Sequence, residues 1–201
     1  MLISCRHIKK SYNDKIVLDG IDLDISRGDR IGLVGRNGAG KSTLADILTG
    51  NSEYDEGSII SSRRKIKVGY LRQTEDGGVF RDVMINEVEM SGELQRLTSH
   101  LGVAGLDVLG EERWHHLSGG EKSKLALAAV WAAQPDLAIL DEPTNHMDYQ
   151  GMEYLIQELQ RFDGAVIIIS HDRYFLDKTV TQIAEIEKGK ITMYPGNYSD
   201  F

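Results

Sequence analysis

Residues 35–43 read GRNGAGKST, and this stretch predicts the core of the fold. It fits the phosphate-loop pattern GxxxxGK followed by Ser or Thr, with Gly35 and Gly40 at the glycine positions. Glycines let backbone N–H groups approach phosphate oxygens closely, because no Cβ stands in the way. Lys41 can reach the β- and γ-phosphates as a point charge, and the Ser42 hydroxyl suits Mg²⁺. The residues expected to surround the phosphates are Gly35, Asn37, Gly38, Ala39, Gly40, Lys41, Ser42 and Thr43.

The flanks of this loop have the context that the motif requires. Residues 30–34 predict a short buried strand, and residues 42–48 predict an apolar-faced helix that ends at Gly50. A helix in this place points its positive end at the bound anion. The alternative is a glycine-rich turn without function, and both flanks argue against it.

Length and charge limit the possible classes of protein. A chain of 201 residues is long enough for one well-buried α/β domain. The formal net charge of −8 argues against non-specific nucleic-acid binding by the domain as a whole, and no direct nucleic-acid site is evident.

The cysteine count and the apolar runs favour a cytoplasmic location. Cys5 has no second cysteine to pair with, which suits a reducing compartment and predicts a small core side chain. The N-terminus lacks the apolar run of a signal peptide. The longest apolar run is residues 125–133, and this is too short to span a membrane, which needs about 20 residues.

The first part of the chain predicts strands around the loop. Residues 2–10 predict an edge strand, and residues 15–25 predict a second strand that is interrupted at Asp19 and Gly20. Residues 11–14 predict the turn between them. Tyr12 on this turn could stack on a nucleotide base, or it could be an ordinary surface tyrosine.

After the first helix, residues 58–61 and 66–71 predict a strand pair with the basic cluster 63–65 as its solvated tip. Gln73 follows the second of these strands. It is either a surface residue or a metal ligand through its side-chain carbonyl oxygen.

Residues 74–116 predict a small helical subdomain inserted in the core. The adjacent His115 and His116 have no further ligands at workable spacing, so we expect exposed histidines rather than a metal site. A strong helix follows over residues 122–133, with Ser118 and Glu121 in the spacing of a capping box.

The glycine pair Gly119 and Gly120 weakens the first turn of that helix, which a simple cap does not explain. Glycines at a helix N-terminus expose N–H donors, as an anion site requires. A well-capped helix without such a site is the alternative.

Three apolar strands end in polar groups: residues 31–34 in the phosphate loop, 137–140 in Asp141 and Glu142, and 166–169 in Ser170 and His171. Ligands of parallel sheets bind outside the carboxyl ends of the strands, so we expect these groups to converge. The remaining elements are a helix over residues 149–162, a short helix through Leu176, and strands over 180–187 and 190–194.

Phosphoryl-transfer chemistry assigns a role to each of these groups. Asp141 would hold Mg²⁺ together with Ser42, and Glu142 would polarise the attacking water as general base. His171 could hydrogen-bond the γ-phosphate and Glu142. Its alternative is a neighbour of a helix cap without a role.

Together these residues resemble the ATP-binding cassette (ABC) ATPase family over essentially the whole chain. The motifs are the phosphate loop, Gln73, LSGGE at 117–121, the strand that ends at Glu142, the loop around Asp148, and His171. The resemblance implies an α/β P-loop cassette with a mixed parallel sheet core, an antiparallel β subdomain at about 1–30 and 57–70, and a helical subdomain at about 74–133. It also makes Tyr12 the base-stacking aromatic residue.

The resemblance further implies ATP and Mg²⁺ as cofactors and a second cassette as partner. The Mg²⁺ ligands would be Ser42, Gln73 and Asp141. In a head-to-tail dimer, Ser118, Gly119 and Gly120 of one cassette would close on the γ-phosphate held by Lys41 of the other. A lone cassette should then be a poor ATPase.

Within the family, two stretches are similar to the ABC-F class of ribosome-associated and antibiotic-resistance proteins: DEPTNHMD at 141–148 and YPGNYSDF at 194–201. This implies the N-terminal half of a two-cassette protein that binds the ribosome and regulates translation or resistance. The alternative is the ATPase subunit of a membrane transporter. A DNA-repair or clamp cassette fits poorly, because the chain has no long coiled-coil insert.

Overall fold

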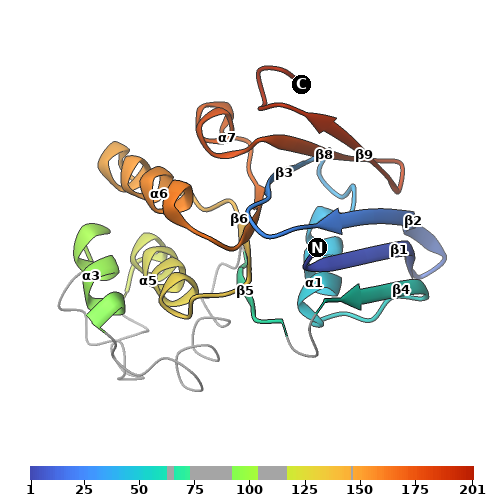
Figure 1. Ribbon diagram of the computed structural model, residues 1–201, viewed down its shortest axis with the longest axis horizontal. Coiled ribbons are helices and arrows are strands. Elements are labelled where there is room, and N and C mark those ends of the chain that lie inside the picture. The colour runs from blue at the N-terminus through green and yellow to red at the C-terminus, as the bar shows by residue number, and fades with distance from the viewer. Residues whose placement is uncertain (63–65, 73–91, 104–116, 146) are drawn as a thin grey trace.

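The computed structural model describes residues 1–62, 66–72, 92–103, 117–145 and 147–201 (Figure 1). The predicted ligand Gln73, the basic cluster 63–65, the histidines at 115 and 116, and most of the predicted helical insert lie outside these residues. The strands are β1 (Ile3–Tyr12), β2 (Lys15–Ile25), β3 (Arg30–Val34), β4 (Glu56–Ser61), β5 (Val68–Leu71), β6 (Leu137–Asp141), β7 (Ala165–Ile169), β8 (Gln182–Glu187) and β9 (Lys190–Pro195). The helices are α1 (Lys41–Thr49), α3 (Gly92–His100), α5 (Gly119–Ala132), α6 (Tyr149–Arg161) and α7 (Arg173–Thr179).

The larger sheet has the strand order β5-β6-β7-β3-β8-β9. All neighbours pair in parallel except β9, which runs antiparallel to β8. β6 and β7 are buried along their whole length, as continuous apolar strands in a covered parallel sheet should be. The prediction of these two strands, of β3 and of the helix after the phosphate loop is confirmed.

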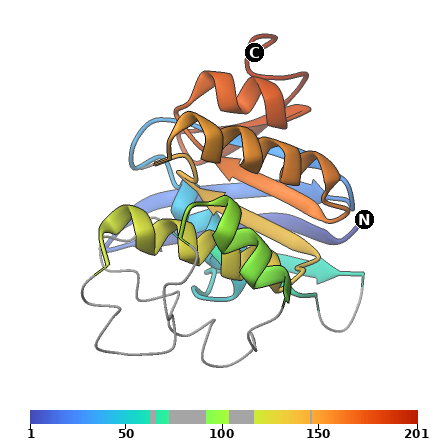
Figure 2. The ribbon, with the colours of Figure 1, turned by 90° about the vertical axis from the view of Figure 1, so that its left-hand side faces the viewer.

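Side chains of the larger sheet alternate between two cores, because successive residues of a strand point to opposite faces. Along β6, Leu137 and Ile139 pack in one core, whereas Ala138 and Leu140 pack in the other. The first core is shared with α1 and the smaller sheet, and the second with α3, α5, α6 and α7 (Figures 1 and 2). The sheet therefore separates α1 from the other helices of the described residues.

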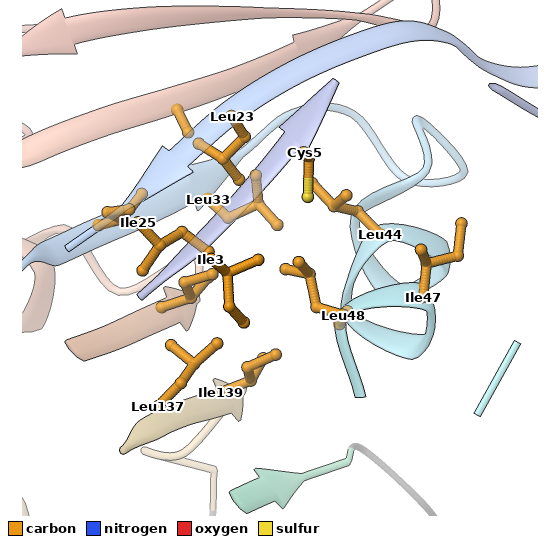
Figure 3. Close-up of a cluster of buried hydrophobic side chains, with 14 of the residues drawn as sticks. Ile3, Cys5, Leu23, Ile25, Leu33, Leu44, Ile47, Leu48, Leu137 and Ile139 are labelled. Carbon is orange, nitrogen blue, oxygen red and sulfur yellow. The ribbon is translucent and has the colours of Figure 1, made fainter. Parts of the chain in front are cut away.

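Cys5 is part of the first core. This residue of β1 lies on the face of the smaller sheet that packs against α1, with its sulfur directed toward the helix (Figure 3). Its exposed fraction is 0%, and burial raises the pKa of its thiol to about 12. The prediction that Cys5 is a small core side chain is confirmed.

The smaller sheet has the order β2-β1-β4 and is antiparallel. The prediction of β1 as an edge strand is wrong, because β4 pairs with its second side. β1 also runs on to Tyr12, and the turn is formed by Asn13 and Asp14 alone, both with positive φ. The predicted interruption of β2 is a bulge: Gly20 has a φ of 80° where the pairing register with β1 shifts.

The predicted pairing of β4 with β5 is also wrong. β4 belongs to the smaller sheet, and β5 pairs in parallel with β6 at the edge of the larger one. Nearness in sequence favours a hairpin. Here β5 instead packs against α5, with Gly69 closely facing Val130 and Pro135.

The two sheets are joined where β2 meets β9. The Asp19 amide donates to the Gly189 carbonyl oxygen at 2.8 Å, and Lys190 Nζ lies 3.0 Å from Asp19 Oδ2. This junction fixes the smaller sheet, which carries Tyr12, against the sheet that carries the phosphate loop.

We predict that Gly69→Ala destabilises the protein. The added Cβ would lie 2.8 Å from Val130 Cγ1 and 3.1 Å from Pro135 Cγ, so α5 must move away from β5. Overpacking of this kind costs about 1–3 kcal/mol, measurable by thermal or urea unfolding. Ser58→Ala on the exposed strand β4 is the control and should stay within about 0.5 kcal/mol of the parent. An unchanged unfolding midpoint for Gly69→Ala would contradict the packing described.

Candidate nucleotide site

Three neighbouring parallel strands bring the predicted site together. β6, β7 and β3 are consecutive in the sheet, so their carboxyl ends meet at one edge. The phosphate loop follows β3, Glu142 follows β6, and Ser170 follows β7. The predicted convergence of these three strand ends is confirmed.

The phosphate loop requires glycine at the two positions where the backbone is most crowded. Gly35 has a φ of 146°, and a Cβ there would lie 2.5 Å from the carbonyl oxygen of Ile186 in β8. Gly40 has a φ of 110°, and its Cβ would lie 2.7 Å from Leu18 Cδ2 in β2. The loop is thus wedged between the two sheets, and only glycine fits these two contacts.

The N-terminus of α1 is open to an anion. Gly40 is its N-cap and provides no side-chain cap, and the first turn carries no acidic residue. The first N–H groups of a helix lack intrahelical partners, and the helix dipole adds positive potential there. This end of α1 therefore fits a phosphate group.

Lys41 lies across the same loop. Its Nζ donates to the carbonyl oxygens of Gly35 at 2.8 Å and Arg36 at 3.2 Å. Burial lowers the pKa of Lys41, while the charges of Asp141 and Glu142 oppose that shift. The ammonium group is thus positioned over the loop, where it can exchange carbonyl oxygens for phosphate oxygens.

Ser42 and Asp141 are in contact at the strand edge. Ser42 Oγ donates to Asp141 Oδ2 at 3.3 Å, and Asp141 is only 6% exposed. Burial raises the pKa of Asp141, and the hydrogen bond from Ser42 opposes this rise. Hydroxyl and carboxylate oxygens are the ligand types that Mg²⁺ prefers, so the pair fits this ion. Among the described residues, no group of three or more His, Cys, Asp or Glu could hold a metal ion.

Glu142 is held from the neighbouring strand. Its backbone adopts a φ of 50°, which few non-glycine residues do, and its amide donates to the Ile169 carbonyl oxygen at 2.7 Å. His171 Nε2 lies 3.7 Å from Glu142 Oε1, so the two side chains are neighbours, but this distance is longer than the hydrogen bond predicted between them. The structure adds Ser170, whose Oγ lies 3.4 Å from Glu142 Oε2 and to which the sequence assigned no role. Its only sequence signal is its place between a buried strand and His171.

Ser118 caps α5 as predicted. Its Oγ accepts from the Glu121 amide, and Glu121 Oε2 accepts from the Ser118 amide at 2.8 Å, so the capping box is confirmed. α5 and α1 lie on opposite faces of the sheet (Figure 1). Among the residues described, no hydrogen bond or ion pair joins Ser118 to residues 35–43.

Two further predicted residues lie at ends of elements. Tyr12 ends β1 and is 47% exposed, with Lys10 Nζ 5.2 Å from its ring centroid. Asp148 is the N-cap of α6 and accepts from the Gly151 amide at 2.8 Å. Tyr12 is thus partly exposed beside Lys10, whereas Asp148 has a structural role as a cap.

Comparisons with known proteins identify relatives over the whole chain. A family model described as "ABC transporter" matches residues 18–145. The putative ATP-binding protein YdiF of Bacillus subtilis is 36% identical, with all of this chain and 38% of YdiF aligned. Two other relatives are each 34% identical over all of this chain: the ATP-binding protein Uup of Buchnera aphidicola and the ribosome protection protein VmlR of B. subtilis. The aligned part is 35% of Uup and 34% of VmlR.

The chain therefore spans about a third of the length of these curated relatives. A solved structure titled as the ATP binding subunit of an ABC transporter matches all of this chain and 91% of its own, with a TM-score of 0.79 at 19% identity. At that identity the likeness concerns the fold alone. None of the helices in the described part is long and apolar enough to cross a membrane.

We predict that Asp141→Asn stabilises the protein without ligand. Burial raises the pKa of Asp141 above its ordinary value of 3.8, so the charged carboxylate destabilises the folded protein at neutral pH. This destabilisation is lost as the pH falls through the pKa of Asp141 in the folded protein and then through its pKa in the unfolded chain. The variant should unfold roughly 2–4 °C higher at pH 7, which corresponds to about 1 kcal/mol, with a smaller difference near pH 4.

The same variant should lose most of the stabilisation that ATP with Mg²⁺ gives to the parent in a thermal-shift assay. The exposed Asp163 offers a matched control, and Asp163→Asn should keep that stabilisation. Two results would contradict the site: an Asp141→Asn protein that unfolds at a lower temperature than the parent at pH 7, or one whose unfolding temperature rises as much as that of the parent when ATP with Mg²⁺ is added.

Proposed function

The chain belongs to the ABC family of ATPases, and on this premise we propose that it binds ATP on residues 35–43 and hydrolyses it with Glu142 as general base. The observation that carries the proposal is the meeting of two polar pairs at adjacent strand ends. Ser42 and Asp141 lie 3.3 Å apart, and Glu142 and His171 lie 3.7 Å apart.

Each residue of the proposed site has a task that follows from its position. Lys41 and the open N-terminus of α1 stabilise the negative charge of the phosphates. Glu142 accepts a proton from the attacking water, and its contacts with Ser170 and His171 orient its carboxylate. His171 is 69% exposed at its side chain, so it can also reach a γ-phosphate.

The proposal also assigns residues to a bound Mg²⁺ ion and to the adenine base of ATP. Bound Mg²⁺ would neutralise charge on the β- and γ-phosphates. Ser42 and Asp141 would hold it, and Gln73 stays a proposed third ligand outside the described residues. The exposed Tyr12 would stack on the adenine base.

A second cassette is the proposed partner. Ser118, Gly119 and Gly120 begin a helix that lies across the sheet from α1, so they need another copy of the fold to meet a phosphate loop. We propose that they close over the γ-phosphate of that second cassette.

We propose an ABC-F role for the complete protein, with the ribosome as partner and the cytoplasm as location. Two observations support this proposal: the stretches 141–148 and 194–201 resemble that class, and the relatives include a ribosome protection protein. The role of a transporter subunit is not better supported: the family model is described as "ABC transporter", but the solved transporter subunit shares only 19% identity.

Two substitutions should separate binding from turnover. Lys41→Ala removes the positive charge that would face the phosphates, so the affinity of this variant for a fluorescent ATP analogue should fall by at least about tenfold. Glu142→Gln should keep that affinity within about twofold while phosphate release falls by about 10²- to 10⁴-fold, because only the proton acceptor is lost. Lys9→Ala, which removes a lysine paired with Glu56 on the smaller sheet, is the control and should change neither. Unaltered nucleotide affinity in Lys41→Ala would refute the binding site, and full turnover in Glu142→Gln would remove Glu142 as base.

The partner is tested with the complete protein carrying Glu142→Gln. We expect it to sediment with purified ribosomes in the presence of ATP and to remain in the supernatant without nucleotide, because trapped ATP holds the cassettes closed. Membrane vesicles from the same cells serve as the competing partner. Sedimentation with vesicles rather than with ribosomes would favour the transporter alternative.

A further inference from the structure

A carboxylate other than Asp141 and Glu142 lies beside the proposed site, on the helix that carries Ser42. Asp46 follows Ser42 by four residues in α1, so the two side chains are on the same face, one turn apart. Asp46 is not an exposed surface group, since its side chain is only 22% accessible. Its charge therefore acts in the same region as the charges of Asp141 and of a bound nucleotide.

Arg72 pairs with this carboxylate. Its Nη2 donates to Asp46 Oδ1, and its guanidinium carbon lies 5.7 Å from the centroid of the Tyr70 ring. Arg72 comes directly after β5, whose last residue Leu71 is paired with Leu140, the residue before Asp141. The cation thus extends from the edge of the sheet next to Asp141 across to α1.

Tyr70 does not help to compensate Asp46. Its hydroxyl is buried and has no hydrogen-bond partner among the residues that the structure describes. The neutralisation of Asp46 therefore depends on the guanidinium of Arg72, which is 35% accessible at its side chain and is attached to the end of a strand rather than to the helix.

We propose that Arg72 is a positioning residue of the ATP site: by pairing with Asp46, it prevents this carboxylate from repelling the triphosphate held on α1. The inference rests on the proposed function, because it assumes that ATP binds residues 35–43. Without Arg72, two carboxylates on neighbouring elements, Asp46 and Asp141, would face the same polyanion. Arg72 acts through Asp46 and does not itself touch the nucleotide.

The test compares three variants of the purified protein: Arg72→Gln, Asp46→Asn and the double variant. Affinity is measured with a fluorescent ATP analogue, with and without Mg²⁺, at low and at high salt. Arg72→Gln should bind the analogue about three- to tenfold more weakly at low salt, and the loss should shrink at high salt as the charge is screened. Asp46→Asn should not weaken binding, and the double variant should return to within about twofold of the parent.

A role limited to structural support predicts a different pattern. It would weaken binding in all three variants, and the double variant would be no better than Arg72→Gln. That pattern would overturn the proposal, as would an Arg72→Gln affinity within twofold of the parent. Thermal unfolding of each variant checks its fold. If Arg72→Gln is unfolded, Arg72→Lys keeps the charge and should keep the affinity, whereas a tenfold loss in Arg72→Lys would equally overturn the proposal.

Arg6→Gln is the matched control for charge. It removes one arginine that pairs with Asp24 on the smaller sheet, so the net charge changes equally while the site keeps its groups. Its affinity should equal that of the parent. The parent protein separates the two levels of inference: failure of the parent to bind the analogue refutes the proposed function, whereas normal binding by both the parent and Arg72→Gln refutes only the role of Arg72.

Discussion

The parallel pairing of β6, β7 and β3 is the constraint on which the site depends. Strands buried on both faces cannot carry charge along their length, because the interior does not solvate it. The first polar residues can appear only where the strands leave the sheet, and parallel strands leave it at the same edge. Asp141 at the end of β6 and Ser170 after β7 are therefore neighbours by topology rather than by sequence. The geometry of the candidate site follows from this packing.

The phosphate loop adds a second constraint, because it is compressed between the two sheets. Gly35 faces the backbone of β8, and Gly40 faces Leu18 of β2. The junction of Asp19 with Gly189 and Lys190 holds β2 and β9 together around this contact. A displacement of the smaller sheet would therefore move the loop. We infer that this packing would hold Tyr12, which is on a different sheet, in a fixed position relative to the proposed nucleotide site.

The parts of this fold that could be predicted are those with a strong local signal. Strands β6 and β7 could be predicted from their apolar runs, and the cap of α5 from the spacing of Ser118 and Glu121. In each case the residues that determine the structure lie within a few positions of one another. The partners of the strands could not be predicted. We expected β1 at the edge of its sheet, but it lies in the middle, and we expected β5 to pair with β4, but it pairs with β6. Periodicity tells which face of a strand is buried but not which strand lies beside it. The left-handed conformation of Glu142 and its contact with Ser170 have no sequence signature either, since both depend on the approach of β7.

The two glycine-rich helix starts differ in a way that bears on how the proposed site would work. α1 begins without a side-chain cap or an acidic residue, so its N–H groups and dipole are available to the first anion that arrives. α5 begins with a satisfied cap, and the hydrogen bonds from Ser118 lower the pKa of Glu121, which keeps a negative charge at that end. That charge offsets part of the helix dipole, so we infer that α5 is a weak anion site by itself. Nucleotide should therefore bind α1 first, and the start of α5 should engage a phosphate only after another cassette has already positioned it.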